Sequence, residues 1–193
     1  AFKPPFLLVH DDGNNQDTLQ ARVNGYLQLS QNKYPAQAIH RIDYETSGLV
    51  LFCKHPFFQA YCDKNMEEHH IKKEYIALVQ GHTNYKNKKI ISNIARDRHN
   101  AKKMIIHPNG KESVSIFNTL KNYKDCSLIQ VTILTGRKHQ IRVQCASLNH
   151  PILNDPLYGG KKIDNTGLLL QSHHIQFNDV DITCPQEKRF IRK

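Results

Sequence analysis

Hydrophobic residues recur every three to four positions in two segments, and a proline marks the start of a third, so the pattern predicts three helices. The first follows Asp17 and Thr18, which can cap it, and ends before residue 32; its apolar positions are Leu19, Val23, Tyr26 and Leu27. The second begins at Pro56, because proline needs no hydrogen-bond partner in a first turn, and runs to about His69. The third ends before Pro151 and carries on one face Ile141, Cys145 and Leu148.

Branched or alternating apolar residues predict strands at residues 48–53, 74–79, 113–120, 127–134, 168–170 and 175–177. Residues 122–125 are turn formers, so the strands on either side of them should form an antiparallel hairpin. Strands and helices do not alternate strictly, and no internal repeat is visible. We therefore expect an α+β fold with a mixed, mostly antiparallel sheet and flanking helices, in one domain over residues 1–193.

Residues 85–111 are rich in basic side chains. Asp97 is the only acid, with Asn, His and Gly spread among the basic residues Lys86, Lys88, Lys89, Arg96, Arg98, Lys102, Lys103 and Lys111. This composition predicts an exposed basic loop.

The whole chain has 27 Lys and Arg against 17 Asp and Glu, and its net charge of +10 attracts polyanions. Nucleic acid is therefore the leading class of partner. No apolar run approaches the roughly 18 residues of a membrane span, and residues 1–5 lack the layout of a signal or transit peptide. The five cysteines are scattered rather than paired, so we expect reduced thiols and a cytoplasmic location.

One segment before the strand at 48–53 combines a guanidinium, a carboxylate and a flexible end: His40-Arg41-Ile42-Asp43-Tyr44-Glu45-Thr46-Ser47-Gly48. Arg41 and Asp43 are two residues apart, so on an extended chain both point the same way and the guanidinium can keep the carboxylate ionised. An ionised carboxylate can act as a nucleophile. The spacing by itself, however, favours a surface ion pair in a turn.

The complete string resembles the His-Arg-Leu-Asp-x-x-Thr-Ser-Gly signature of the RluA-like pseudouridine synthases, with Ile42 in the Leu place. The resemblance implies the catalytic fold of that family, with Asp43 as the catalytic residue. It also implies that the loop, with Arg41 and Thr46, borders the uridine pocket.

Two further segments look like motifs of the same family. Lys73-Glu74-Tyr75-Ile76-Ala77-Leu78-Val79-Gln80-Gly81 is similar to its Lys-x-Tyr-x-Ala-Leu-Val-x-Gly strand, so Tyr75 would line the site and either stack on the base or act as a general base. Thr135-Gly136-Arg137-Lys138-His139-Gln140-Ile141-Arg142-Val143, followed by Asp155-Pro156-Leu157-Tyr158-Gly159, resembles the third motif region. It implies that Arg142 pairs with the catalytic Asp, while Arg137, His139 and Gln140 support the loop or touch RNA.

Weaker similarities extend over nearly the whole chain. Lys3-Pro4 with Leu7-Leu8-Val9-His10 resembles the opening of the family's catalytic domain, which implies an upstream strand or an S4-type RNA-binding domain outside this chain. Arg96, Lys102 and Lys103 match a basic hairpin that reaches over RNA in relatives, and Leu170 matches an apolar wall for uracil. Two departures, Gln144 and Gln171-Ser172, stand where relatives often have His and His-Ala, and we expect them to alter the pocket.

The resemblance implies an enzyme that isomerises specific uridines in ribosomal or transfer RNA after flipping the base out of its stack. Asp43 would either attack C1′ or promote departure of uracil through a glycal, with Tyr75 taking the C2′ proton. Neither route needs a metal or cofactor, because hydrogen-bonded uracil is an adequate leaving group. We expect structured RNA as the substrate, no membrane contact, no obligate protein partner and a monomer.

Two other classes of protein stay open. A non-catalytic RNA-binding protein could keep these motifs, and the two departures are the only hint of it. A metal-dependent hydrolase is prompted by the twelve histidines. It is disfavoured because adjacent pairs such as His69-His70 seldom bind one ion and no His-Glu-x-x-His motif is present.

Overall fold

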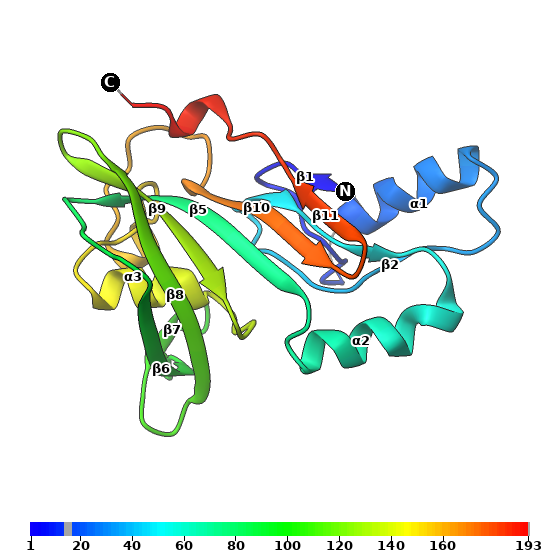
Figure 1. Cartoon of the computed structure of the whole chain (residues 1–193), viewed down its shortest axis with the longest axis horizontal. Coiled ribbons are helices and arrows are strands. Elements are labelled where there is room, and N and C mark those ends of the chain that lie inside the picture. The colour runs from blue at the N-terminus through cyan, green and yellow to red at the C-terminus, as the bar shows by residue number, and fades with distance from the viewer. Residues whose placement is uncertain (14–16, 193) are drawn as a thin grey trace.

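A computed structural model describes residues 1–13 and 17–192 as a broad sheet with helices at both ends (Figure 1). The strands are β1 (Phe2–Lys3), β2 (Gln37–Ala38), β3 (Ser47–Leu49), β4 (Phe52–Cys53), β5 (Lys72–Gln80), β6 (Lys88–Arg96), β7 (Met104–Ile106), β8 (Lys111–Asn122), β9 (Cys126–Ile133), β10 (Leu170–Phe177) and β11 (Val180–Thr183). The α-helices are α1 (Leu19–Leu29), α2 (Gln59–Glu67) and α3 (Gln140–Ser147). Short 3-10 turns are η1 (Pro56–Phe58), η2 (Pro156–Tyr158) and η3 (Lys188–Phe190).

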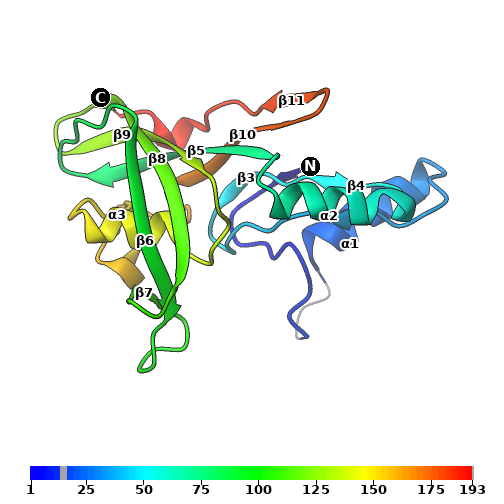
Figure 2. The same cartoon turned by 60° about the horizontal axis from the view of Figure 1, so that its bottom comes forward.

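The main sheet has the strand order β1-β3-β10-β5-β9-β8-β6-β7, with β11 paired to β10, while β2 and β4 form a separate pair. Neighbouring strands are antiparallel except β3 and β10, which run parallel. Figures 1 and 2 show α1 and α2 at one end of the sheet and α3 at the other. The predicted α+β fold with a mixed, mostly antiparallel sheet is confirmed.

Strand β5 lies at the centre of the core, and its alternating side chains serve two faces. Tyr75, Ala77 and Val79 belong to the largest apolar cluster, which also holds Ile141 of α3. Ile76 and its neighbour Leu78 pack on the opposite face in a second cluster. Because alternate residues of a strand point to opposite faces, this burial fixes the face on which Tyr75 lies.

The three predicted helices and the predicted hairpin are confirmed. Thr18 caps α1 by accepting a hydrogen bond from the backbone N–H of Ala21 at 3.1 Å. Pro56 opens η1, which leads directly into α2. Strands β8 and β9 are antiparallel, and the turn between them closes with a 2.8 Å bond from the Tyr123 N–H to the Cys126 carbonyl.

The predicted exposed loop at residues 85–111 is wrong, because β6 and β7 occupy much of it. Strand β6 pairs with β8 on one side and β7 on the other. Ile94 is buried against α3, and Ile90 packs on the main core, whereas Lys88 and Lys89 stay exposed. A strand of an antiparallel sheet needs only one buried face, so its other face can carry charged residues. The prediction of a loop was based on those charges alone.

Two strand predictions have wrong boundaries. Residues 48–53 divide between β3 in the main sheet and β4 in the small one, since the chain crosses between the sheets at Val50. Residues 168–170 and 175–177 belong largely to one strand, β10, which is continuous through the polar residues 171–174 and carries a register shift between Ser172 and His174. Strand β11 was not predicted.

All five cysteines are free and buried. In the part of the chain that the structure describes, no helix is long and apolar enough to cross a membrane.

Gly48 should be irreplaceable, because it carries φ +114° and a Cβ there would lie 2.2 Å from the Ser172 carbonyl oxygen. We predict that Gly48→Ala lowers the free energy of unfolding by at least about 2 kcal/mol, measured in urea. Gly25→Ala in α1, where a Cβ meets nothing within 4 Å, is the matched control and should stabilise by about 0.5–1 kcal/mol. Equal effects of the two substitutions would contradict the close pairing of β3 with β10.

Candidate active site

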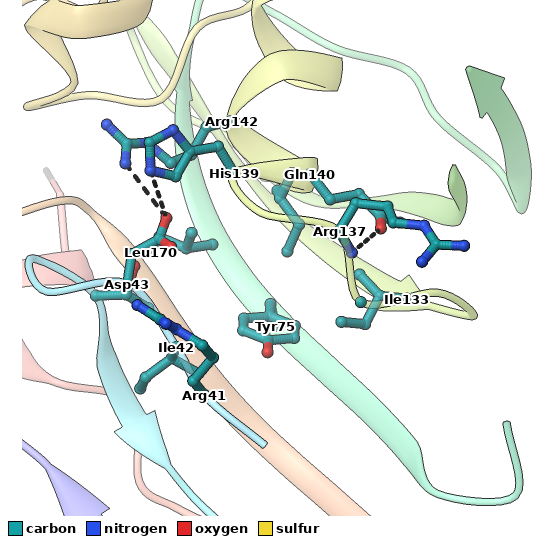
Figure 3. A pocket seen from close by; sticks show the side chains of 13 residues that line it. Arg41, Ile42, Asp43, Tyr75, Ile133, Arg137, His139, Gln140, Arg142 and Leu170 are labelled. Atoms are coloured by element: carbon teal, nitrogen blue, oxygen red, sulfur yellow. Dashed lines mark hydrogen bonds and ion pairs between the residues drawn. The ribbon is translucent and has the colours of Figure 1, made fainter. Parts of the chain in front are cut away.

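A pocket forms where segments far apart in the sequence meet (Figure 3). The loop before β3, strand β5, the end of β9, the start of α3 and the start of β10 all contribute to it. The lining residues are Arg41, Ile42, Asp43, Thr46, Tyr75, Ile133, Gly136, Arg137, His139, Gln140, Ile141, Arg142 and Leu170. Asp43, Tyr75 and Arg142, the three predicted catalytic residues, therefore lie in one pocket.

The loop that carries Asp43 is held by its own turn and by a buried lysine. The Thr46 N–H donates to the Asp43 carbonyl at 3.1 Å, which closes the turn. Lys3 is fully buried, and its ammonium donates to the carbonyls of Tyr44 at 3.1 Å, Leu7 at 2.8 Å and Pro4 at 2.9 Å. Burial lowers the pKa of Lys3 to about 8. The three carbonyls satisfy its donors, so Lys3 ties the N-terminal segment to the Asp43 loop.

Arg142 links two carboxylates of different burial. Its Nε and Nη2 donate to the two oxygens of Asp155 at 2.7 and 2.8 Å, and its Nη1 donates to Asp43 Oδ2 at 3.2 Å. Asp155 is completely buried, whereas the Asp43 side chain keeps 25% of its surface exposed. Burial opposes the charge of Arg142, but the bonds to Asp155 and the two carboxylates outweigh it and raise its pKa. Arg142 thus places a permanent positive charge against Asp43.

His139 lies beside the Arg142 guanidinium and faces the same oxygen of Asp43, with its Nε2 3.8 Å from Oδ2 (Figure 3). Its Nδ1 is 2.8 Å from the Tyr158 hydroxyl, which accepts a 2.8 Å bond from the Met104 N–H. Because the hydroxyl already accepts one bond and still has a proton to give, we assign Nδ1 as the acceptor of that proton and place the imidazole proton on Nε2. Burial lowers the pKa of His139 to about 4, so the ring that faces Asp43 is neutral at physiological pH.

Aromatic and aliphatic side chains form the walls of the pocket. Tyr75 is buried, and burial raises its pKa. Figure 3 shows its ring bordering the pocket with the hydroxyl turned away from the Asp43 carboxylate. Ile133 and Leu170 add apolar surface. Thr46 also lines the pocket, and its buried Oγ1 has no hydrogen-bond partner among the described residues.

The expected pairing of Arg41 with Asp43 is not found, because the ion pair of Asp43 among the described residues is with Arg142. Arg41 is exposed at the pocket edge. Arg137 is also exposed there, with its Nε on the Glu112 carbonyl at 2.9 Å.

Gln140 supports the loop instead of facing a ligand. Its amide oxygen accepts from Thr135 Oγ1 and the Arg137 N–H, at 2.8 and 3.0 Å. Its amide nitrogen donates to Val114 and Ser115 of β8. A side chain with both ends engaged in this way fixes the turn between β9 and α3.

Two of the three predicted hairpin residues reach the site. Lys102 lines a hollow that continues from Asp43 and Arg142 toward the β6–β7 loop. The Lys103 ammonium lies 5.7 Å from the centre of the Tyr158 ring. Arg96 lies in a separate hollow between β6 and β7, lined by neighbours such as Arg98 and His107.

Neither Gln144 nor Gln171 lines the pocket, so an effect of these two departures on it would be indirect. Gln144 is fully buried on the sheet side of α3, where its amide donates to Ser92 and Ser113. Gln171 is also buried, and its amide donates to the Pro185 carbonyl at 2.9 Å. Both glutamines serve internal packing.

Three residues of the site were not given roles from the sequence: Lys3, Asp155 and Tyr158. All three lie in segments that the motifs had marked, but the site residues that they contact, Tyr44, His139 and Arg142, are 13 to 41 positions away along the chain. For Lys3 and Asp155, the sequence signal was a charged residue within an otherwise apolar or glycine-rich motif. Among the described residues, no group of three or more His, Cys, Asp or Glu could hold a metal ion.

The fold and site define a basic domain with an open antiparallel sheet and a carboxylate-centred pocket. Residues 2–147 match the family described as RNA pseudouridylate synthase. The chain belongs to this family.

Among curated relatives, an uncharacterized RNA pseudouridine synthase of Bacillus subtilis is 35% identical over 82% of this chain and 53% of its own length. Ribosomal large subunit pseudouridine synthase C of Buchnera aphidicola is 39% identical over 84% of this chain and 51% of its own. The chain thus spans about half the length of these two relatives. Human RNA pseudouridylate synthase domain containing 4 has the same fold, with a TM-score of 0.78, 18% identity, and coverage of 98% of this chain and 85% of that one.

The tautomer of His139 can be tested by nitrogen NMR of the imidazole ring. We predict an Nε2–H ring that stays neutral down to about pH 5, since burial lowers its pKa to about 4. Tyr158→Phe removes the donor to Nδ1 and should shift the ring toward a mixture of tautomers. Tyr123→Phe, on the β8–β9 turn, should leave the His139 signals unchanged. An Nδ1–H ring in the unaltered protein would contradict the assignment.

Proposed function

We propose that this chain is the catalytic domain of an enzyme that converts uridine to pseudouridine in RNA, with Asp43 as the reacting carboxylate. The observation that carries the proposal is the geometry of Asp43. Arg142 donates to its Oδ2 and His139 lies 3.8 Å from the same atom, whereas its Oδ1 accepts no hydrogen bond from the described residues. One oxygen is therefore anchored while the other is available for chemistry.

The pocket suits a flat ring with polar edges. The Tyr75 ring and the side chains of Ile133 and Leu170 offer surfaces against which uracil could pack. The unpartnered Oγ1 of Thr46 offers a hydrogen bond to a base carbonyl or a sugar hydroxyl. A base reaches such a pocket only after leaving its stack, which costs a few kcal/mol.

Isomerisation requires the N1–C1′ bond to break and a C5–C1′ bond to form. Asp43 would either attack C1′ to give an ester or assist departure of uracil through a glycal, in which a base removes the C2′ proton. Burial disfavours the phenolate of Tyr75, and its hydroxyl points away from Asp43. Both observations favour Tyr75 as a stacking wall.

Large ribosomal RNA is the proposed substrate, because relatives such as those of Buchnera aphidicola and Zymomonas mobilis carry the name ribosomal large subunit pseudouridine synthase. The net charge of +10 supports contact with RNA phosphates. Lys102, in the hollow that continues from the Asp43 pocket, is placed to contribute. Action on transfer RNA, a cofactor-free reaction, a monomeric state and a cytoplasmic location stay predictions.

Asp43→Asn should abolish the reaction while preserving the fold, since it changes one atom of a side chain that is partly exposed. We predict that tritium release from large ribosomal RNA labelled at uridine C5 falls by roughly 10²–10⁴-fold or more. Asp63→Asn, the same change on an exposed acid of α2, is the matched control and should keep full activity. Equal turnover by Asp43→Asn and the unaltered chain would contradict the assignment. Absence of turnover in the unaltered chain would favour a non-catalytic RNA-binding protein.

Substitutions of Tyr75 separate a stacking role from a proton-transfer role. Tyr75→Leu removes the aromatic face, so we predict a rise in KM equivalent to about 1–3 kcal/mol of lost stacking. Tyr75→Phe keeps the ring and should keep KM. Steady-state kinetics of tritium release gives both values, and a kcat that collapses in Tyr75→Phe would make the hydroxyl a participant in proton transfer.

A further inference from the structure

A second hollow lies beside the Asp43 pocket and is continuous with it. The two share the lining residues Arg41, Tyr75, Ile133, Gly136 and Arg137. The second hollow extends from these residues to the C-terminal end of α2 and to Lys73 on β5. A ligand that fills the first pocket can therefore continue into the second without leaving the surface.

Lys73 is a buried lysine that has no anionic partner among the described residues. The residue is 5% exposed, and its ammonium donates to the sulfur of Met66 at 3.0 Å. No ion pair with Lys73 is found among the described residues, although most charged groups this deeply buried are paired. A thioether is a weak acceptor, so the ammonium retains donors for a ligand.

The strand geometry directs Lys73 toward the site. Lys73 and Tyr75 are two residues apart on β5, so both lie on the same face of the sheet, and Tyr75 lines both hollows. Lys72 and Glu74 lie on the opposite face, where they form a 3.0 Å ion pair with each other. The two adjacent lysines therefore differ in their charge partners. Lys72 is paired with Glu74 at the surface, whereas Lys73 faces the pocket with no carboxylate partner among the described residues.

The charges around the hollow favour an anion. Arg41 and Arg137 are exposed at its boundary with the Asp43 pocket. Burial lowers the pKa of His40 to about 3, so its ring adds no charge. Glu67 also lines the hollow, but it is exposed and forms no ion pair with Lys73. Burial lowers the pKa of Lys73 to about 8, which leaves it mostly protonated at neutral pH.

We propose that this hollow binds an RNA backbone phosphate next to the nucleotide held in the Asp43 pocket, with the Lys73 ammonium on a phosphate oxygen. The inference rests on the proposed function, because the nucleotide in the first pocket must be part of an RNA strand. A compact ammonium suits a phosphate oxygen, and the two arginines can hold the neighbouring backbone. The binding of a phosphate also supplies the countercharge that Lys73 lacks.

Lys73→Met tests the subsite, because it removes the charge and keeps an unbranched apolar chain. With large ribosomal RNA labelled at uridine C5, we expect KM to rise about tenfold or more with little change in kcat, as for a contact made equally in the ground and transition states. The slope of log affinity against log salt, from filter binding of the same RNA, should fall by about 0.7–0.9 for one lost phosphate contact. Lys72→Met is the matched control and should leave both quantities unchanged.

Urea unfolding separates binding from folding. Lys73→Met should be at least as stable as the unaltered chain, because a buried ammonium without an anion is costly. An unchanged KM and salt slope in Lys73→Met would overturn the subsite, as would equal losses in Lys72→Met or a fall in kcat with KM unchanged. In each of these cases the unaltered chain would still release tritium and the proposed function would stand. No tritium release by the unaltered chain would refute the proposed function and the subsite together.

Discussion

The guanidinium of Arg142 is buried between a fully buried carboxylate, Asp155, and a partly exposed one, Asp43. Removing one partner of a buried ion pair typically costs about 3–5 kcal/mol, so Asp155 holds Arg142 firmly in one orientation. Nη1 then donates to Asp43, at 3.2 Å. Asp155 therefore fixes the guanidinium, whereas Oδ1 of Asp43 accepts no hydrogen bond in the part of the chain that the structure describes. Asp43 needs no strong bonds of its own to stay in place, because Lys3 and the Thr46 turn hold its backbone.

The central strand β5 positions two further residues of the site, Tyr75 and Lys73. Its burial on both faces fixes its register against β9 and β10, and a slip of one residue would turn Tyr75 out of the pocket. The same register puts Lys73 beside the pocket, at a place where the core offers it only a sulfur atom. A position that is unfavourable for stability is consistent with a role in binding, since natural sequences depart from good packing mostly at functional sites.

Much of the fold could be predicted from local sequence signals. Thr18 capped α1 as its position predicted, and the β8–β9 turn formed from its turn residues. Strand β6 was not predicted because its sequence is rich in basic residues. Its apolar residues Ile90 and Ile94 are buried by the core and by α3, which lie far away along the chain. The candidate site was located through motif resemblance, since the spacing of Arg41 and Asp43 favoured a surface ion pair. The actual partner of Asp43 lies 99 positions along the chain, beyond the reach of any local pattern.

The hydrogen bonds around His139 join the β6–β7 hairpin to the ring that faces Asp43. The Met104 N–H at the start of β7 holds the Tyr158 hydroxyl, the hydroxyl fixes the His139 ring, and the ring faces Asp43. Lys102 and Lys103 immediately precede Met104, and Lys103 lies over the Tyr158 ring. The Tyr158 hydroxyl therefore connects the start of β7 to the His139 ring through two hydrogen bonds. Lys102 of the hairpin loop and Asp43 both line the hollow that continues from the pocket.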